Sequence, residues 1–154
     1  MAVPYLACMA LVASIYHLPP RVLPSIHHVE GGAPGSVQTN ANGSQDLGVM
    51  QVNTLWLPAL GRVAGLSESE VRDRLVNRAC FNIAAAGAIM RLYLDEAKGD
   101  LMLAIGNYHS HTPVRNQNYQ RLVRSAATRL FVSGGRQTGI GLTGDRFPAR
   151  PSRS

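Results

Sequence analysis

The chain has 154 residues, of which 45% are hydrophobic and 16% are charged, so it can form one core and is too short for two ordinary domains. Its formal charge is +6, but residues 133–154 hold four of the arginines and a single acidic residue, Asp145. A nucleic-acid partner would call for basic residues interleaved with aromatic residues on one folded face, and the sequence has no such stripe. The charge would instead suit another anionic polymer.

The chain begins with an apolar run, "AVPYLACMALVASIY". A signal peptide normally opens with positive charge, yet the first basic residue, Arg21, lies beyond the run. We therefore expect a structural helix here. No segment reaches the roughly 20 apolar residues that a membrane span requires, so we expect no membrane span.

The next helix is expected to start after Pro19 and Pro20 and to end on Glu30, because prolines suit a helix start. Val22, Leu23, Ile26 and Val29 form its apolar face. Residues 31–47 are rich in Gly, Asn and Ser, which predicts a long loop with a short hairpin near "NANGS". Loops of this length inside a compact domain are often functional.

Helical patterns dominate the remainder. Ser67 and Glu70 have capping-box spacing, Gly99 is a stop signal, Asp100 can cap the following helix, and Pro113 breaks the chain. The helices are expected over residues 54–60, 67–77, 79–97, 101–111 and 116–132. The sequence predicts one mainly helical domain over residues 1–132, followed by a basic Gly/Arg/Pro/Ser tail over residues 133–154 that is expected to be disordered.

Glu30 is the first candidate for chemistry. An exposed glutamate at a helix end is the simplest interpretation, but Glu30 extends an apolar face and stands at a helix C-terminus, where the dipole disfavours an acid. A carboxylic acid held against apolar surface can donate a proton near neutral pH. A metal site is the rival, because His27 and His28 precede Glu30; their spacing matches no H-E-x-x-H pattern, so we expect no metal.

The two cysteines, Cys8 and Cys80, leave two interpretations open. They are two separate buried thiols, since free cysteine is a common core residue, or they pair in an oxidising compartment. The spacing alone does not decide between them.

Four blocks of the chain give a resemblance to a known family. These are "VLPSIHHVEGG" around Glu30, "NGSQDLGVMQVN", "ACFNIAAAGAIM", and "AIGNYHS" with a later "NYQRLV". In order and type they resemble the lytic transglycosylases of the lysozyme-like superfamily, in particular the small single-domain members that accompany secretion, conjugation and pilus systems. The resemblance covers about residues 5–125 and implies a lysozyme-like α+β fold, with the long loop as one wall of a glycan cleft.

The resemblance also implies roles for individual residues. Glu30 would be the catalytic acid and base, and Tyr108 would orient Glu30 or the substrate's N-acetyl group, whereas the role of Tyr119 is more structural. Asp46 would bond within its loop and is not expected to be a second catalytic carboxylate. Cys8 and Cys80 would form a disulfide in an oxidising periplasm. The residues implied in substrate binding are Gly48, Val49, Met50, Gln51, Asn53, Tyr108, His109 and Tyr119, with core packing the main role expected of Met50.

The implied function is cleavage of peptidoglycan glycan strands by a monomer that needs no cofactor. Ordinary glycosidases use two carboxylates, whereas a transglycosylase needs one, since the substrate's own hydroxyl is its nucleophile. Two alternatives stay open: a hydrolytic lysozyme, and a non-catalytic wall-binding or assembly module. The chain departs from the family's pattern at Gly31, where Ser is usual, and at His109, where Asn is frequent.

Overall fold

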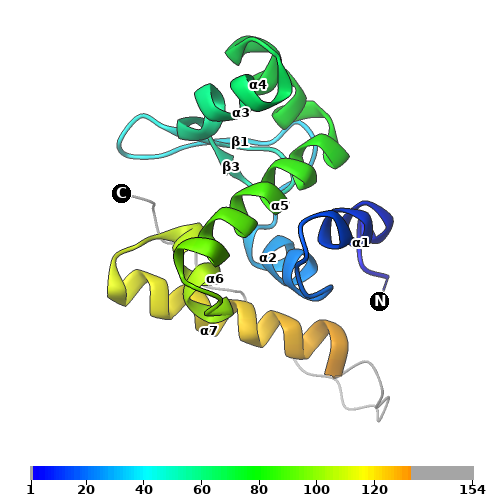
Figure 1. Cartoon of the computed structure of the whole chain (residues 1–154), viewed down its shortest axis with the longest axis vertical. Helices are drawn as coiled ribbons and strands as arrows, with labels where there is room; N and C mark the ends of the chain where they lie inside the picture. The colour runs from blue at the N-terminus through cyan, green and yellow to red at the C-terminus, as the bar shows by residue number, and fades with distance from the viewer. Residues whose placement is uncertain (1, 133–154) are drawn as a thin grey trace, which may run out of the picture.

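The computed structural model describes residues 2–132, which form a mainly helical structure with a small antiparallel sheet (Figure 1). This confirms the mainly helical part of the expected fold. The expected disordered tail, residues 133–154, lies outside the described residues. The helices are α1 (Leu6–Ile15), α2 (Val22–Glu30), α3 (Leu57–Ala64), α4 (Glu68–Asn77), α5 (Ala79–Glu96), α6 (Leu101–His109) and α7 (Pro113–Ala127), with a 3₁₀ turn η1 (Thr54–Trp56) and a π-helical turn η2 (Thr128–Val132).

Helix α5 is the centre of the fold. Figure 1 shows it running through the middle of the molecule, with the sheet, α3 and α4 toward one end and α6 and α7 toward the other. It packs against α1, α4 and α6. Its buried residues include Ile83, Ala86 and Met90, none of which is exposed to solvent. The helix expected over residues 79–97 is therefore confirmed, with its end one residue earlier, at Glu96.

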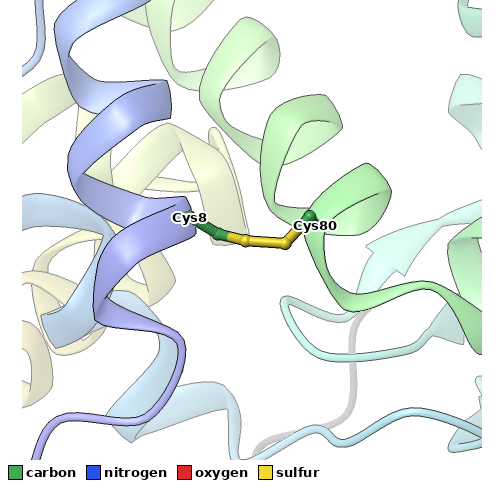
Figure 2. The surroundings of a disulfide bond; sticks show 2 residues. All are labelled: Cys8 and Cys80. Carbon is green, nitrogen blue, oxygen red and sulfur yellow. A yellow bond between two sulfur atoms is a disulfide. The ribbon is translucent and has the colours of Figure 1, made fainter.

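Helix α1 is fixed to α5 by a disulfide. Cys8 and Cys80 form the bond, which Figure 2 shows bridging the two helices. Further along α5, a Cβ at Gly87 would overlap the Val12 side chain, so the helices approach closely there. The apolar run at the start of the chain thus belongs to the folded domain, as predicted, and the implied pairing is confirmed. Among residues 2–132, no helix is both long enough and apolar enough to span a bilayer.

The long loop folds into a three-stranded sheet. Strands β1 (Val37–Thr39), β2 (Gln45–Leu47) and β3 (Val52–Asn53) are antiparallel in the order β1-β2-β3. The predicted hairpin joins β1 and β2. Its turn closes through the Asn40 amide, which donates to the Ser44 carbonyl at 2.8 Å, and through Gly43, whose positive φ of 83° suits glycine. Strand β3 was not expected from the sequence.

Local signals placed most helix ends correctly. Ser67 and Glu70 form the expected capping box of α4, and Asp100 accepts a hydrogen bond from the Leu103 amide at 3.1 Å. The prediction for the last helix was wrong by three residues: α7 starts at Pro113. A proline lacks the N–H that the first helical position does not use, so Pro113 begins this helix.

Candidate active site

Glu30 is the last residue of α2, and its side chain is only 8% exposed. The Tyr119 hydroxyl, from α7, donates a hydrogen bond to Glu30 Oε1 at 2.8 Å. The next residue, Gly31, ends the helix. Gly31 has φ 66°, and its amide donates to the His27 carbonyl at 2.8 Å, so it ends the helix in the left-handed conformation that glycine favours.

The two histidines before Glu30 differ in their surroundings. His27 Nε2 lies 3.0 Å from the Gly32 carbonyl oxygen. Burial, together with the charges of Arg129 and His27, lowers the pKa of His28. In the described part of the chain, no three His, Cys, Asp or Glu side chains are grouped to hold a metal ion.

The segment after Glu30 lies against the turn at residues 48–51. A Cβ at Gly32 would overlap the carbonyl oxygen of Gly48, and a Cβ at Gly48, which has φ 66°, would overlap the carbonyl oxygen of Leu75. Both positions therefore need glycine for close backbone approach. The contact brings the block "GVMQVN" next to the helix end that carries Glu30.

The buried side chain of Asn82, on α5, holds this turn. Its Nδ2 donates to the carbonyls of Leu47 at 2.7 Å and Leu75 at 2.8 Å, and its Oδ1 accepts from the Met50 amide at 2.8 Å. Buried polar groups need partners, and here one amide satisfies three backbone groups from two segments. Asn82 was not among the residues predicted for the site, although an Asn within an apolar helix was a usable signal.

Two further side chains support the turn. The Tyr108 hydroxyl, from α6, donates to the Met50 carbonyl at 2.8 Å. Gln51 has a positive φ of 54°, and its Nε2 donates to the Gly48 carbonyl at 2.9 Å. A buried non-glycine residue in this conformation stores strain, which often occurs at functional sites.

Asn53 and Asp46 are paired inside the sheet. Asn53 Nδ2 donates to Asp46 Oδ1 at 3.0 Å and to Ser44 Oγ at 3.0 Å. Asp46 has no exposed surface. This bond crosses the sheet from β2 to β3, whereas a bond within the loop was expected of Asp46.

A cavity of about 330 Å³ lies between the sheet and the end of α6. The side chains that line it are neutral amides and hydroxyls, aromatic rings and one aliphatic residue, Leu55. The amides and hydroxyls are Asn42, Ser44, Asn53, Asn107, Ser110 and Thr112; the rings are Trp56, Tyr93, Tyr108, His109 and His111.

Seven of the predicted site residues fall into two connected groups, and Val49 and Asn53 lie outside them. Gly48, Met50, Gln51 and Tyr108 form the turn and its support. The second group is Glu30, Tyr119 and His109: the His109 ring stacks on the Tyr119 ring with centroids 4.8 Å apart. Val49, which is 1% exposed, belongs to the core. Asn53 reaches the cavity.

The two tyrosines differ from expectation. The hydroxyl that bonds Glu30 is that of Tyr119, for which a more structural role was expected, whereas that of Tyr108 bonds the Met50 backbone. The inward position of Tyr119 was visible in the helical pattern, since Asn116, Val123 and Ala126 are buried with it. Its contact with Glu30 was not visible.

Comparisons with models of protein families and with curated proteins find no match for the chain.

Proposed function

We propose that the protein is a peptidoglycan lytic transglycosylase with a lysozyme-like fold. The observation that carries the proposal is the buried Glu30 carboxyl, held by the Tyr119 hydroxyl at 2.8 Å and linked through His109 to the wall of the cavity. A buried carboxyl with a fixed donor suits general acid and base catalysis.

The lining of the cavity favours a neutral saccharide as the ligand. Rings with amides and hydroxyls can contact the apolar faces of a sugar and bond its hydroxyl and acetamido groups. Its lining contains no Lys or Arg, which a phosphate-rich ligand would require. N-acetylated glycan strands fit this description.

In the proposed reaction, Glu30 protonates the oxygen of the β-1,4 bond between N-acetylmuramic acid and N-acetylglucosamine, and the bond from C1 to that oxygen breaks. The C6 hydroxyl of the same muramoyl residue then attacks C1 and gives its proton to the Glu30 carboxylate. The product is a 1,6-anhydromuramoyl end, and Glu30 regains its proton. Water is not consumed.

The setting we propose is the bacterial periplasm, where the enzyme would open the wall locally for an envelope-spanning secretion, conjugation or pilus apparatus. The Cys8–Cys80 bridge supports an oxidising compartment. The net charge of +6 would favour contact with an anionic wall.

A hydrolytic muramidase is the second candidate, because Glu96 stands beside the cavity. Its Oε1 accepts from His111 Nε2 at 2.6 Å and from Asn107 Nδ2 at 3.3 Å, and both of these residues line the cavity. Hydrolysis would use a second carboxylate to activate water. Glu96 is the residue that the test of this alternative must change.

The test is digestion of purified sacculi by the oxidised wild type, Glu30→Gln, Glu96→Gln and a control, Glu68→Gln, which is exposed on α4. Mass spectrometry identifies the products. We expect anhydro ends from every protein except Glu30→Gln. Reducing ends that disappear in Glu96→Gln would establish hydrolysis instead, and no product from the wild type would reject both enzymatic proposals.

A binding measurement tests the third alternative, a non-catalytic glycan-binding module. Trp56 is the single tryptophan of the chain and lines the cavity, so its fluorescence reports on this site. We expect triacetylchitotriose to change the Trp56 fluorescence of Glu30→Gln. Saturable binding by an inactive wild type would favour the binding module.

A further inference from the structure

We propose that His109 is a positioning residue for Glu30 and that it acts through Tyr119. The inference rests on the proposed function. It assigns to His109 a task other than the substrate contact expected from the sequence, and it concerns one of the two positions at which the chain departs from the family's pattern.

The observation is a flat contact between two rings. The rings of His109 and Tyr119 are inclined by only 9°, with centroids 4.8 Å apart, which is offset stacking. Both side chains are buried: His109 is 9% exposed and Tyr119 is 3% exposed. The imidazole therefore covers one face of the ring whose hydroxyl bonds Glu30.

Tyr119 needs to be held because its hydroxyl has a geometric task. It donates to Oε1 of Glu30 at 2.8 Å. In a protonated carboxyl, the carbonyl oxygen is the better acceptor, so a donor at Oε1 favours the acid proton on Oε2. A ring that tilted toward α6 would lengthen this bond. The His109 ring occupies the space into which that tilt would go.

The crossing of α6 and α7 makes this support rigid. A Cβ at Gly106 would overlap the side chain of Asn116, so the helices are in close contact one turn before the stacked rings. Asn116 Nδ2 also donates to Asn107 Oδ1 at 2.8 Å and to the Ser110 carbonyl at 3.2 Å. Loss of the ring at 109 therefore leaves a gap that the backbone is not free to close.

The same geometry distinguishes positioning from proton chemistry. Neutral and protonated imidazole are both flat, so the stack needs a ring and does not need a titration. Phenylalanine can provide that ring, whereas asparagine, the residue frequent in the family, cannot. A role in proton transfer or in direct sugar binding would require the imidazole nitrogens instead.

The experiment compares His109→Phe and His109→Asn with the wild type, using His17→Asn as a matched control in an exposed segment. The assay measures kcat and KM on soluble glycan strands, with melting temperatures to check folding. We expect His109→Asn to lower kcat roughly tenfold to a hundredfold, the scale of a misplaced catalytic group, with KM nearly unchanged. We expect His109→Phe to retain kcat.

Three results would overturn the proposal. The first is a rise in KM with unchanged kcat in His109→Asn, and the second is an equal loss of kcat in His109→Asn and His109→Phe. The third is that the effects of His109→Asn and Tyr119→Phe on kcat are fully additive in free energy. Crystal structures provide a readout that does not depend on activity. We expect the Tyr119–Glu30 bond to be kept in His109→Phe and lost in His109→Asn. An inactive wild type would reject the proposed function, but an unchanged bond in His109→Asn would reject the positioning role by itself.

Discussion

The turn at residues 48–51 and the carboxyl of Glu30 lie on adjoining segments but are held in different ways. The turn is fixed through its backbone, by Asn82 at the Met50 amide and by Tyr108 at the Met50 carbonyl. Glu30 is contacted at its side chain, by the Tyr119 hydroxyl. Under the proposed function, the turn is a wall that must not move, whereas Glu30 is an acid that must change its protonation state.

The physical reason lies in what each group can do when a partner is lost. A buried backbone amide or carbonyl has no alternative state, so an unsatisfied one costs free energy. A carboxyl can take up or release a proton and so adapt to its surroundings. We therefore expect changes at the turn to reduce stability more than activity, and changes around Glu30 to reduce activity more than stability.

The largest expected effect on stability comes from the disulfide, which fixes the end of α5 that carries Asn82. Replacing both Cys8 and Cys80 by alanine should lower the free energy of unfolding by about 4 kcal/mol, because the bridge closes a long loop in the unfolded chain. Urea unfolding of the oxidised wild type and the double variant measures this. Hydrogen exchange at the Met50 amide should accelerate in the variant, and unchanged exchange there would show that α5 holds the turn without the bridge.

The next effect is that of Asn82→Ala. The substitution leaves two carbonyls and one amide without their present partner, and we expect a loss of about 3 kcal/mol in the free energy of unfolding. Asn77→Ala is the matched control, because Asn77 is exposed and its side chain donates to Asp73, one turn earlier on the same helix. If Asn82→Ala is as stable as Asn77→Ala, the turn does not depend on Asn82. The contrast between the turn and Glu30 is then wrong.

Removing one hydroxyl from each tyrosine tests the comparison directly. Tyr108→Phe should cost about 1 to 2 kcal/mol of stability, because the Met50 carbonyl loses a buried donor. Tyr119→Phe should cost less stability but lower kcat roughly tenfold or more. Thermal unfolding and kinetics on glycan strands measure both. The reverse pattern, with Tyr108→Phe stable and inactive, would return the catalytic role to Tyr108.

The sequence predicted those parts of the fold that depend on local signals. The capping box at Ser67 and Glu70, the cap at Asp100 and the stop signal at Gly99 act within one or two helical turns, so they were visible without tertiary structure. Strand β3 was missed because it has only two residues and is defined by its pairing with β2.

The candidate site was predicted less completely, because its contacts join distant segments. Glu30 was found from its place at the end of an apolar helix, but its bond with Tyr119 spans 89 residues and depends on the packing of α2 against α7. The bonds of Asn82 and Tyr108 to Met50 span 32 and 58 residues. Residue types and spacing identify such groups as polar and buried, but not which of them meet.

The smallest expected effect tests whether a substitution at the start of α4 alters the turn at residues 48–51, which α4 contacts near its other end. Helix α4 begins at the capping box and supplies the Leu75 carbonyl to Asn82. Ser67→Ala should lower the free energy of unfolding by about 1 kcal/mol, the usual effect of losing a helix cap, with activity unchanged. Ser69→Ala, exposed on the same helix, is the control.

The effect of Ser67→Ala should also depend on pH. Hydrogen bonds from the Ser67 amide and hydroxyl, with a smaller effect of the Arg74 charge, lower the pKa of Glu70. Because the folded pKa lies below the unfolded one, this contribution is present above the ordinary range of a glutamate, roughly pH 4 to 5, and is lost as the pH falls through the folded pKa. The stability difference should therefore shrink in acid, as urea unfolding at several pH values would show. A loss of activity in Ser67→Ala at neutral pH would mean that the turn is not held independently of the start of α4.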